Sequence, residues 1–171
     1  MIKKLLNYLS SFKFCKKHTI NQIPLEIANE EKIVRSIFSP INLSKDGQKI
    51  NTNSFRPPAG LDEISVNRLD YTSTNFCKQI SKKNERPESD RSYFGFGLLY
   101  ANEIRDADVD IVYSPLEDNK FHSDIKIGFT VVKGEPLPAE INFKIKKLAS
   151  SAKLFADPSP DSRTWDGSVV E

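Results

Sequence analysis

The chain has 171 residues, of which 38% are hydrophobic and 28% charged, with a formal net charge of +2 at pH 7. This length fits one globular domain with its own core, and no apolar run approaches the roughly 20 residues of a membrane-spanning helix. Residues 1–20 hold five lysines and no acid, which leaves 20 basic and 23 acidic residues in the rest. The mildly acidic body argues against a broad nucleic-acid-binding surface.

The two cysteines, Cys15 and Cys77, lie in no Cys-x-x-Cys or Cys/His cluster. This excludes a zinc site built from cysteines. We expect free thiols in a reducing compartment, and therefore a cytoplasmic protein, with a single disulfide as the less favoured alternative.

The first residues predict a basic amphipathic helix over 1–20 that is separable from the body. Its apolar stripe consists of Ile2, Leu5, Leu6, Leu9 and Phe12, and lysines surround the opposite side. We favour packing of this stripe on the body or on another subunit. The alternative is peripheral contact of residues 1–18 with an anionic membrane surface. Lysines 13, 16 and 17 argue against a secretory signal.

The next segments alternate between short apolar runs and turns. Residues 30–38 fit a short helix as well as a buried strand, and Pro40 ends either one. Residues 55–60 hold two prolines and a glycine and predict a rigid corner that carries Arg56, a candidate binding residue. The strand expected over 63–71 changes the phase of its apolar residues near Arg68, which suggests a β-bulge.

Arg68 has two interpretations, a buried arginine paired with an acid of the sheet or a solvated one, and we favour the first.

Thr72 and Ser73 can cap a following helix that turns Phe76, Cys77 and Ile80 toward the core. The run 82–91 has no apolar residue, so it predicts a mobile surface loop and a poor phosphate site.

Residues 93–100 predict a strand in which Gly95 and Gly97 share one side, so a helix or a ligand could approach the backbone there. The Phe-Gly-Phe-Gly pattern lacks the third glycine of a dinucleotide-binding fingerprint. Residues 101–107 predict a short helical turn. A helix expected over 138–155 has a clear apolar stripe of Ile141, Ile145, Leu148, Ala149, Ala152 and Phe155.

Residues 108–113 and 121–129 predict a hairpin, in which His122, Asp124 and Lys126 face away from the dry side. If Tyr113 lies opposite Phe121, then Asp110 lies opposite Asp124, with Cβ atoms roughly 5 Å apart. Like charges at that spacing require a cation, a basic side chain or full solvation. We favour a solvated polar face.

The alternative is that Asp110 and Asp124 hold Mg²⁺ or Mn²⁺ while Lys126 helps to activate water. Asp110 followed by Asp124-Ile125-Lys126 resembles the spaced Asp and Asp-x-Lys of metal-dependent nucleases of the restriction-endonuclease type. His122, on the same face, is the fourth candidate catalytic residue. The pattern is unspecific in a chain this charged, and nucleic acid is an expected partner under this alternative alone.

Two other chemistries have weaker support. A Ser-His-Asp hydrolase needs Ser123 or a distant serine beside His122, and no Gly-x-Ser-x-Gly elbow is present. A nucleophilic Cys77 paired with His122 competes with simple packing of the cysteine in a core.

We therefore expect an α+β fold with a mainly antiparallel sheet and a C-terminal helix packed on one face. The expected units are the helix over 1–20, one domain over 21–156 and an irregular tail over 157–171. In the tail, Trp165 is either a clasp on the body, which we favour, or a partner-binding anchor.

The function expected from these features is a non-catalytic binding or accessory module without a cofactor. It docks on a protein partner or on a second copy of itself, with Arg56, Arg68 and Trp165 as candidate binding residues. The alternative function is a metal-dependent phosphodiester hydrolase that uses Asp110, Asp124 and Lys126.

Overall fold

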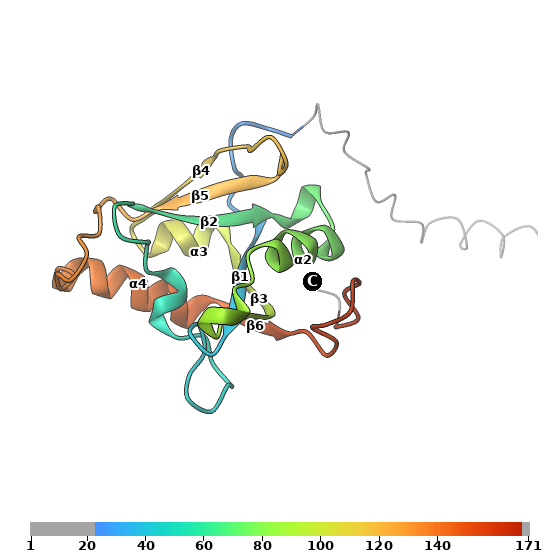
Figure 1. Cartoon of the computed structure of the whole chain (residues 1–171). Helices are drawn as coiled ribbons and strands as arrows, with labels where there is room; N and C mark the ends of the chain where they lie inside the picture. Colours follow the sequence, from blue (N-terminus) through green and yellow to red (C-terminus); the bar gives the residue numbers. More distant parts are fainter. Residues whose placement is uncertain (1–22, 169–171) are drawn as a thin grey trace, which may run out of the picture.

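The fold is α+β, with a mainly antiparallel sheet, as the sequence predicts. The computed structural model describes residues 23–168, so the amphipathic helix expected over residues 1–20 lies outside the described residues. Within them, six strands form one antiparallel sheet in the order β4-β5-β2-β1-β3-β6 (Figure 1). The strands are β1 (Lys32–Ser39), β2 (Glu63–Arg68), β3 (Ser92–Tyr100), β4 (Asp110–Tyr113), β5 (His122–Lys126) and β6 (Lys153–Ala156).

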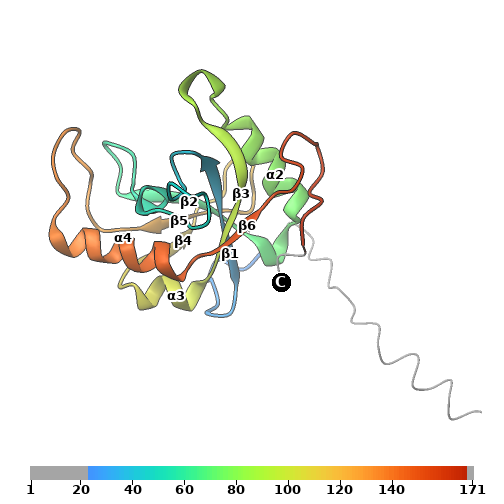
Figure 2. The same cartoon turned by 90° about the horizontal axis from the view of Figure 1, so that it is seen from below.

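Helices cover both faces of this sheet (Figures 1 and 2). They are α2 (Thr74–Lys83), α3 (Ala101–Asp106) and α4 (Ala139–Ser151), with short 3-10 turns η2 (Thr52–Phe55), η3 (Leu69–Tyr71) and η4 (Pro87–Ser89). Helices α3 and α4 lie on one face, and α2 and the C-terminal residues lie on the other. Every helix in residues 23–168 is too short or too polar to cross a bilayer.

Alternating side chains of β1 build the two apolar clusters. Ile33 and Ile37 point into the larger cluster beneath α3 and α4. Val34 and Phe38 point into the smaller one, which Leu69, Cys77 and the half-buried Trp165 complete on the α2 side. Residues 30–38, for which the sequence allowed either a helix or a strand, therefore contain a strand. Its successive side chains point to opposite faces of the sheet, and both faces are buried.

The expected helix over 138–155 is too long. It ends at Ser151, and the chain turns at Ala152 into β6, which pairs with β3. In β6, Leu154 packs on the larger cluster and Phe155 on the smaller one, so the two residues serve opposite faces. A helix could not separate neighbouring side chains in this way, because successive residues are only about 100° apart.

The close approach expected at the glycines of β3 is made by the chain itself. A Cβ atom on Gly95 would lie 2.1 Å from the carbonyl oxygen of Phe155, and one on Gly97 would lie 2.8 Å from a methyl group of Ile50. Only glycine therefore lets β6 pair tightly with β3 at Gly95.

Arg68 is a buried arginine paired with an acid, as expected, and that acid is Glu31, just before β1. Its Nε and Nη2 atoms donate to the Glu31 carboxylate at 2.8 and 2.7 Å, and the guanidinium also donates to the carbonyls of Pro24 and Glu26. The expected β-bulge at this point is absent, because β2 keeps a regular register with β5 and ends at Arg68. The irregularity lies between Ile37 and Phe38, where β1 pairs with β3.

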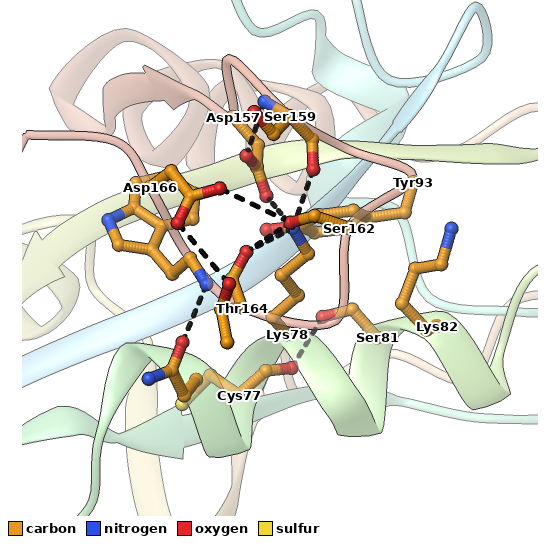
Figure 3. Close-up of polar contacts among 12 residues, drawn as sticks. Cys77, Lys78, Ser81, Lys82, Tyr93, Asp157, Ser159, Ser162, Thr164 and Asp166 are labelled. Carbon is orange, nitrogen blue, oxygen red and sulfur yellow. Dashed lines mark hydrogen bonds and ion pairs between the residues drawn. The ribbon is translucent and has the colours of Figure 1, made fainter.

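Residues 157–164 fold around one buried lysine of α2, Lys78 (Figure 3). Nζ of Lys78 donates to the carbonyls of Ser159 and Thr164 and to the hydroxyl of Ser162, and it forms an ion pair with Asp157. Trp165 packs on Phe96 with ring centroids 5.1 Å apart, which is the clasp expected for this residue.

Candidate functional site

A groove of about 390 Å³ opens on the α2 side of the sheet. Its walls come from β1, β2 and the loop before it, the C-terminal end of α2, the residue before β3, the loop between β4 and β5, and the first residue of β5. The lining side chains that matter below are Arg35, Phe38, Ile80, Arg91, Leu116 and His122. A second, more open hollow of about 660 Å³ lies between residues 48–52 and α4, and its lining contains neither a histidine nor an acid.

The groove forms where β1 and β2 stop pairing with each other. They pair at Ile33 with Arg68 and at Val34 with Asn67, and beyond that point residues 40–60 fold back into the opening. Arg35 spans it by donating to the carbonyl oxygens of Ser65 in β2 (2.6 Å) and Ser54 in η2 (3.1 Å). Its side chain thereby satisfies backbone acceptors that a neighbouring strand would otherwise bind.

Arg91 forms a second basic feature of the groove. Its guanidinium carbon lies 4.2 Å from the centroid of the Phe38 ring, a distance typical of a cation–π contact. Its Nε atom is buried and has no hydrogen-bond partner among residues 23–168. Burial and the charge of Arg86 lower the pKa of Arg91. Burial and the charge of Arg91 in turn lower the pKa of Arg35 to about 10, which leaves it protonated at neutral pH.

The acidic side chains around the groove are engaged by lysines. Lys83 of α2 reaches Asp118 of the β4–β5 loop at 3.3 Å, and these side chains are 63% and 64% exposed. Lys126 binds the carboxylate of Glu63, which lines the groove. Both pairs are partly or largely exposed and contribute little stability. They nevertheless neutralise the acids near the two arginines.

His122, which lines the groove, belongs to a hydrogen-bonded cluster with Ser114 and Asp124. Nδ1 of His122 lies 2.8 Å from the carbonyl oxygen of Ser114, which can only accept, so the proton belongs on Nδ1. The Ser114 hydroxyl lies 2.5 Å from Oδ2 of Asp124 and 3.1 Å from His122 Nδ1, and Nε2 of His122 lies 3.7 Å from Asp124 Oδ1. The hydroxyl therefore donates to the carboxylate, whereas a serine nucleophile needs its proton directed at the imidazole.

The expected hairpin register is wrong by two residues. Tyr113 lies opposite Ser123, Asp110 opposite Lys126, and Val112 opposite Asp124. The cause is the loop, which closes on itself through Leu116 and Asn119 and lengthens the connection. In addition, the Asn119 side chain binds Asn67 in the buried interior.

The true register separates the residues expected to hold a metal. Asp110 and Asp124 become diagonal neighbours, roughly 7–8 Å apart at Cβ, with Lys126 directly opposite Asp110. Within residues 23–168, no group of three or more His, Cys, Asp or Glu side chains could hold a metal ion. The face is not solvated as expected either, because His122 and Asp124 are 8% and 6% exposed.

The other candidate residues lie apart from the groove lining. Arg56 is exposed beside η2, the guanidinium of Arg68 is engaged by Glu31, and Trp165 is half-buried on Phe96. Cys77 is fully buried in the smaller apolar cluster, and burial raises the pKa of its thiol to about 12. A neutral buried thiol is a poor nucleophile.

Sequence reasoning missed Arg35, Arg91 and Ser114. Arg35 is half-buried and stands between Ile33 and Ile37 in β1, so an arginine among buried apolar residues is the signal for it once the segment is read as a strand. Arg91 belongs to the run expected to be a mobile loop, but η4 and the bridge between Arg86 and Arg91 give that run a defined turn.

Comparison of the chain with protein-family models, with curated proteins and with solved structures finds no match. The function is therefore argued from the groove itself.

Proposed function

We propose that the protein is a non-catalytic binding module that docks on a protein partner through the groove between α2, β2 and the β4–β5 loop. The observation that carries this proposal is the combination of apolar and basic side chains in one opening. Leu61 and Leu116 line it and are 44% and 47% exposed, beside the half-buried Ile80. Exposed apolar side chains around a polar depression are typical of sites that bind a peptide segment.

The polar cluster around His122 supports binding over catalysis. Ser114 and Asp124 are hydrogen-bonded to each other, so neither is poised to attack a substrate. The cluster instead fixes the end of the β4–β5 hairpin and, with it, the position of Leu116.

A cytoplasmic location remains part of the proposal, and the free buried thiol of Cys77 is compatible with it.

A random-peptide display library panned on the whole chain tests the proposal. We expect an enriched family of peptides whose affinity falls about tenfold or more with Leu116→Ser, because the variant removes an apolar contact at the groove. Leu25→Ser is the matched control, since Leu25 is 83% exposed and lies outside the groove lining. Peptides that bind both variants like the wild type, or a library without enrichment, would contradict the proposal.

Sedimentation velocity then decides whether the partner is a second copy. A concentration-dependent dimer that Leu116→Ser abolishes and Leu25→Ser preserves would identify self-association through the groove. If the chain stays monomeric at all concentrations, the partner that binds the groove is a different protein.

A further inference from the structure

Arg35 and Arg91 bring two positive charges into the groove without an acidic partner. Within residues 23–168, neither guanidinium lies within ion-pair distance of a carboxylate, although Asp124 is near enough to Arg35 to offset part of its charge. The charges of Arg35, Arg86 and Arg91 also act against one another, because Arg91 lowers the pKa of Arg35 and Arg86 lowers the pKa of Arg91. These two guanidinium groups, Arg35 and Arg91, which lack an ion-pair partner within residues 23–168, favour the binding of an anion in the groove.

The charges around the groove define which anion fits. The carboxylates of Asp118 and Glu63 are matched by Lys83 and Lys126, respectively. The remaining excess is the charge of Arg91 and the part of Arg35 that Asp124 does not offset. A single carboxylate balances the charge of Arg91 together with the part of the Arg35 charge that remains.

We propose that the groove binds the carboxylate of an acidic side chain in an extended segment of the partner, seated against Arg35 and Arg91. This inference rests on the proposed docking function of the groove. In an extended peptide, every second side chain points the same way. A glutamate flanked at two residues on either side by leucines would therefore present its carboxylate to the arginines and its leucines to Leu61 and Leu116.

The chain's own basic segment does not suit this site. Residues 1–20 contain five lysines and no acid, so their side chains supply no carboxylate. The positive charge of the groove therefore favours an acidic segment of a partner over this basic one. Arg91 supplies positive charge that the carboxylate would balance, and the Phe38 ring packs against its guanidinium.

A pair of blocked pentapeptides tests the inference, Leu-Thr-Glu-Thr-Leu and its neutral counterpart Leu-Thr-Gln-Thr-Leu. Nuclear magnetic resonance of the whole chain follows the Nε–Hε signal of Arg91 during each titration. We expect the acidic peptide to shift this signal and to bind about tenfold more tightly than the neutral one. Arg91→Gln should remove the difference between the peptides, and the exposed Arg56→Gln should preserve it.

The outcomes separate this inference from the docking function. If both peptides bind equally and Leu116→Ser weakens both, the groove is a docking site but the carboxylate assignment is wrong. If neither peptide binds, the assignment is overturned, and the library selection decides the docking function independently. Inorganic phosphate that shifts the Arg91 signal while the acidic peptide does not would also overturn it. The comparison of the two peptides on the wild-type chain stands even if Arg91→Gln fails to fold.

Discussion

Nζ of Lys78 lies 2.7 Å from Oδ2 of Asp157, and both side chains are completely excluded from solvent. The pair joins α2 to the first residue after β6, and three further hydrogen bonds from Nζ order the residues that follow (Figure 3). Residues 157–165 are therefore held both by the buried Lys78 amine and by the packing of Trp165 on Phe96. Each member of the Lys78–Asp157 pair compensates the desolvation of the other.

Lys78→Met should lower the free energy of unfolding by about 3–5 kcal/mol, because it leaves the Asp157 carboxylate buried without its cation. Urea denaturation at neutral pH measures the change. Lys83→Met is the control on the same helix. Its exposed pair with Asp118 should contribute about 0–1 kcal/mol. Equal effects of the two variants would show that the Lys78 pair has no special role.

Arg68→Lys should destabilise the protein by about 3 kcal/mol even though it preserves the charge. A lysine cannot reproduce the two-pronged contact with Glu31 while also reaching the carbonyls of Pro24 and Glu26. The exposed Arg56→Lys should change stability by less than about 0.5 kcal/mol. Thermal unfolding of both variants measures the difference, and a neutral Arg68→Lys would show that charge alone matters at this site.

Local signals in the sequence predict the elements that local chemistry determines. The cap at Ser73 is one example, because its hydroxyl accepts from the amide of Phe76 as expected. The strand over 93–100 and the short helix after it are others. The conformation of each of these elements is determined by residues close to it in the chain, so a few sequence positions are sufficient to predict it.

Distant contacts determine the features that the sequence did not reveal. Phe155 continues the apolar stripe of α4 in sequence, but it belongs to β6, where it pairs with Phe96 of β3. The hairpin register depends on Asn119, whose side chain binds Asn67 fifty-two residues away. The groove also depends on distant parts of the chain, because Arg35 of β1 and Arg91, which precedes β3, line it together only when the sheet forms.

Stability should fall at alkaline pH because of the Cys77 thiol. Burial raises its pKa from 9.0 to about 12, so the unfolded chain loses this proton first. The contribution of the neutral thiol is therefore complete below pH 9 and is lost as the pH rises from 9 toward 12. Between pH 9 and pH 10, we expect a loss of about 1 kcal/mol from this group.

Cys77→Ala should remove that loss, although the variant is less stable at every pH because it leaves a small cavity. Urea denaturation at pH 8, 9 and 10 compares the slopes of the two proteins. Burial also raises the pKa of Tyr93, which adds a change of the same sign above about pH 10, but Tyr93 is present in both proteins. Parallel pH profiles would contradict the role of the thiol.

Millimolar Mn²⁺ or Mg²⁺ should leave the melting temperature unchanged. Asp110 faces Lys126 across the hairpin, and the Asp124 carboxylate accepts the Ser114 hydroxyl proton, so the two acids are not arranged as a pair that needs a cation. A metal present at one hundred times its dissociation constant would add about 2.7 kcal/mol to the stability of the folded state. Calorimetry detects a change of that size without knowledge of any substrate. A shift that Asp110→Asn and Asp124→Asn each abolish, while the exposed Asp161→Asn preserves it, would favour the hydrolase over the binding module.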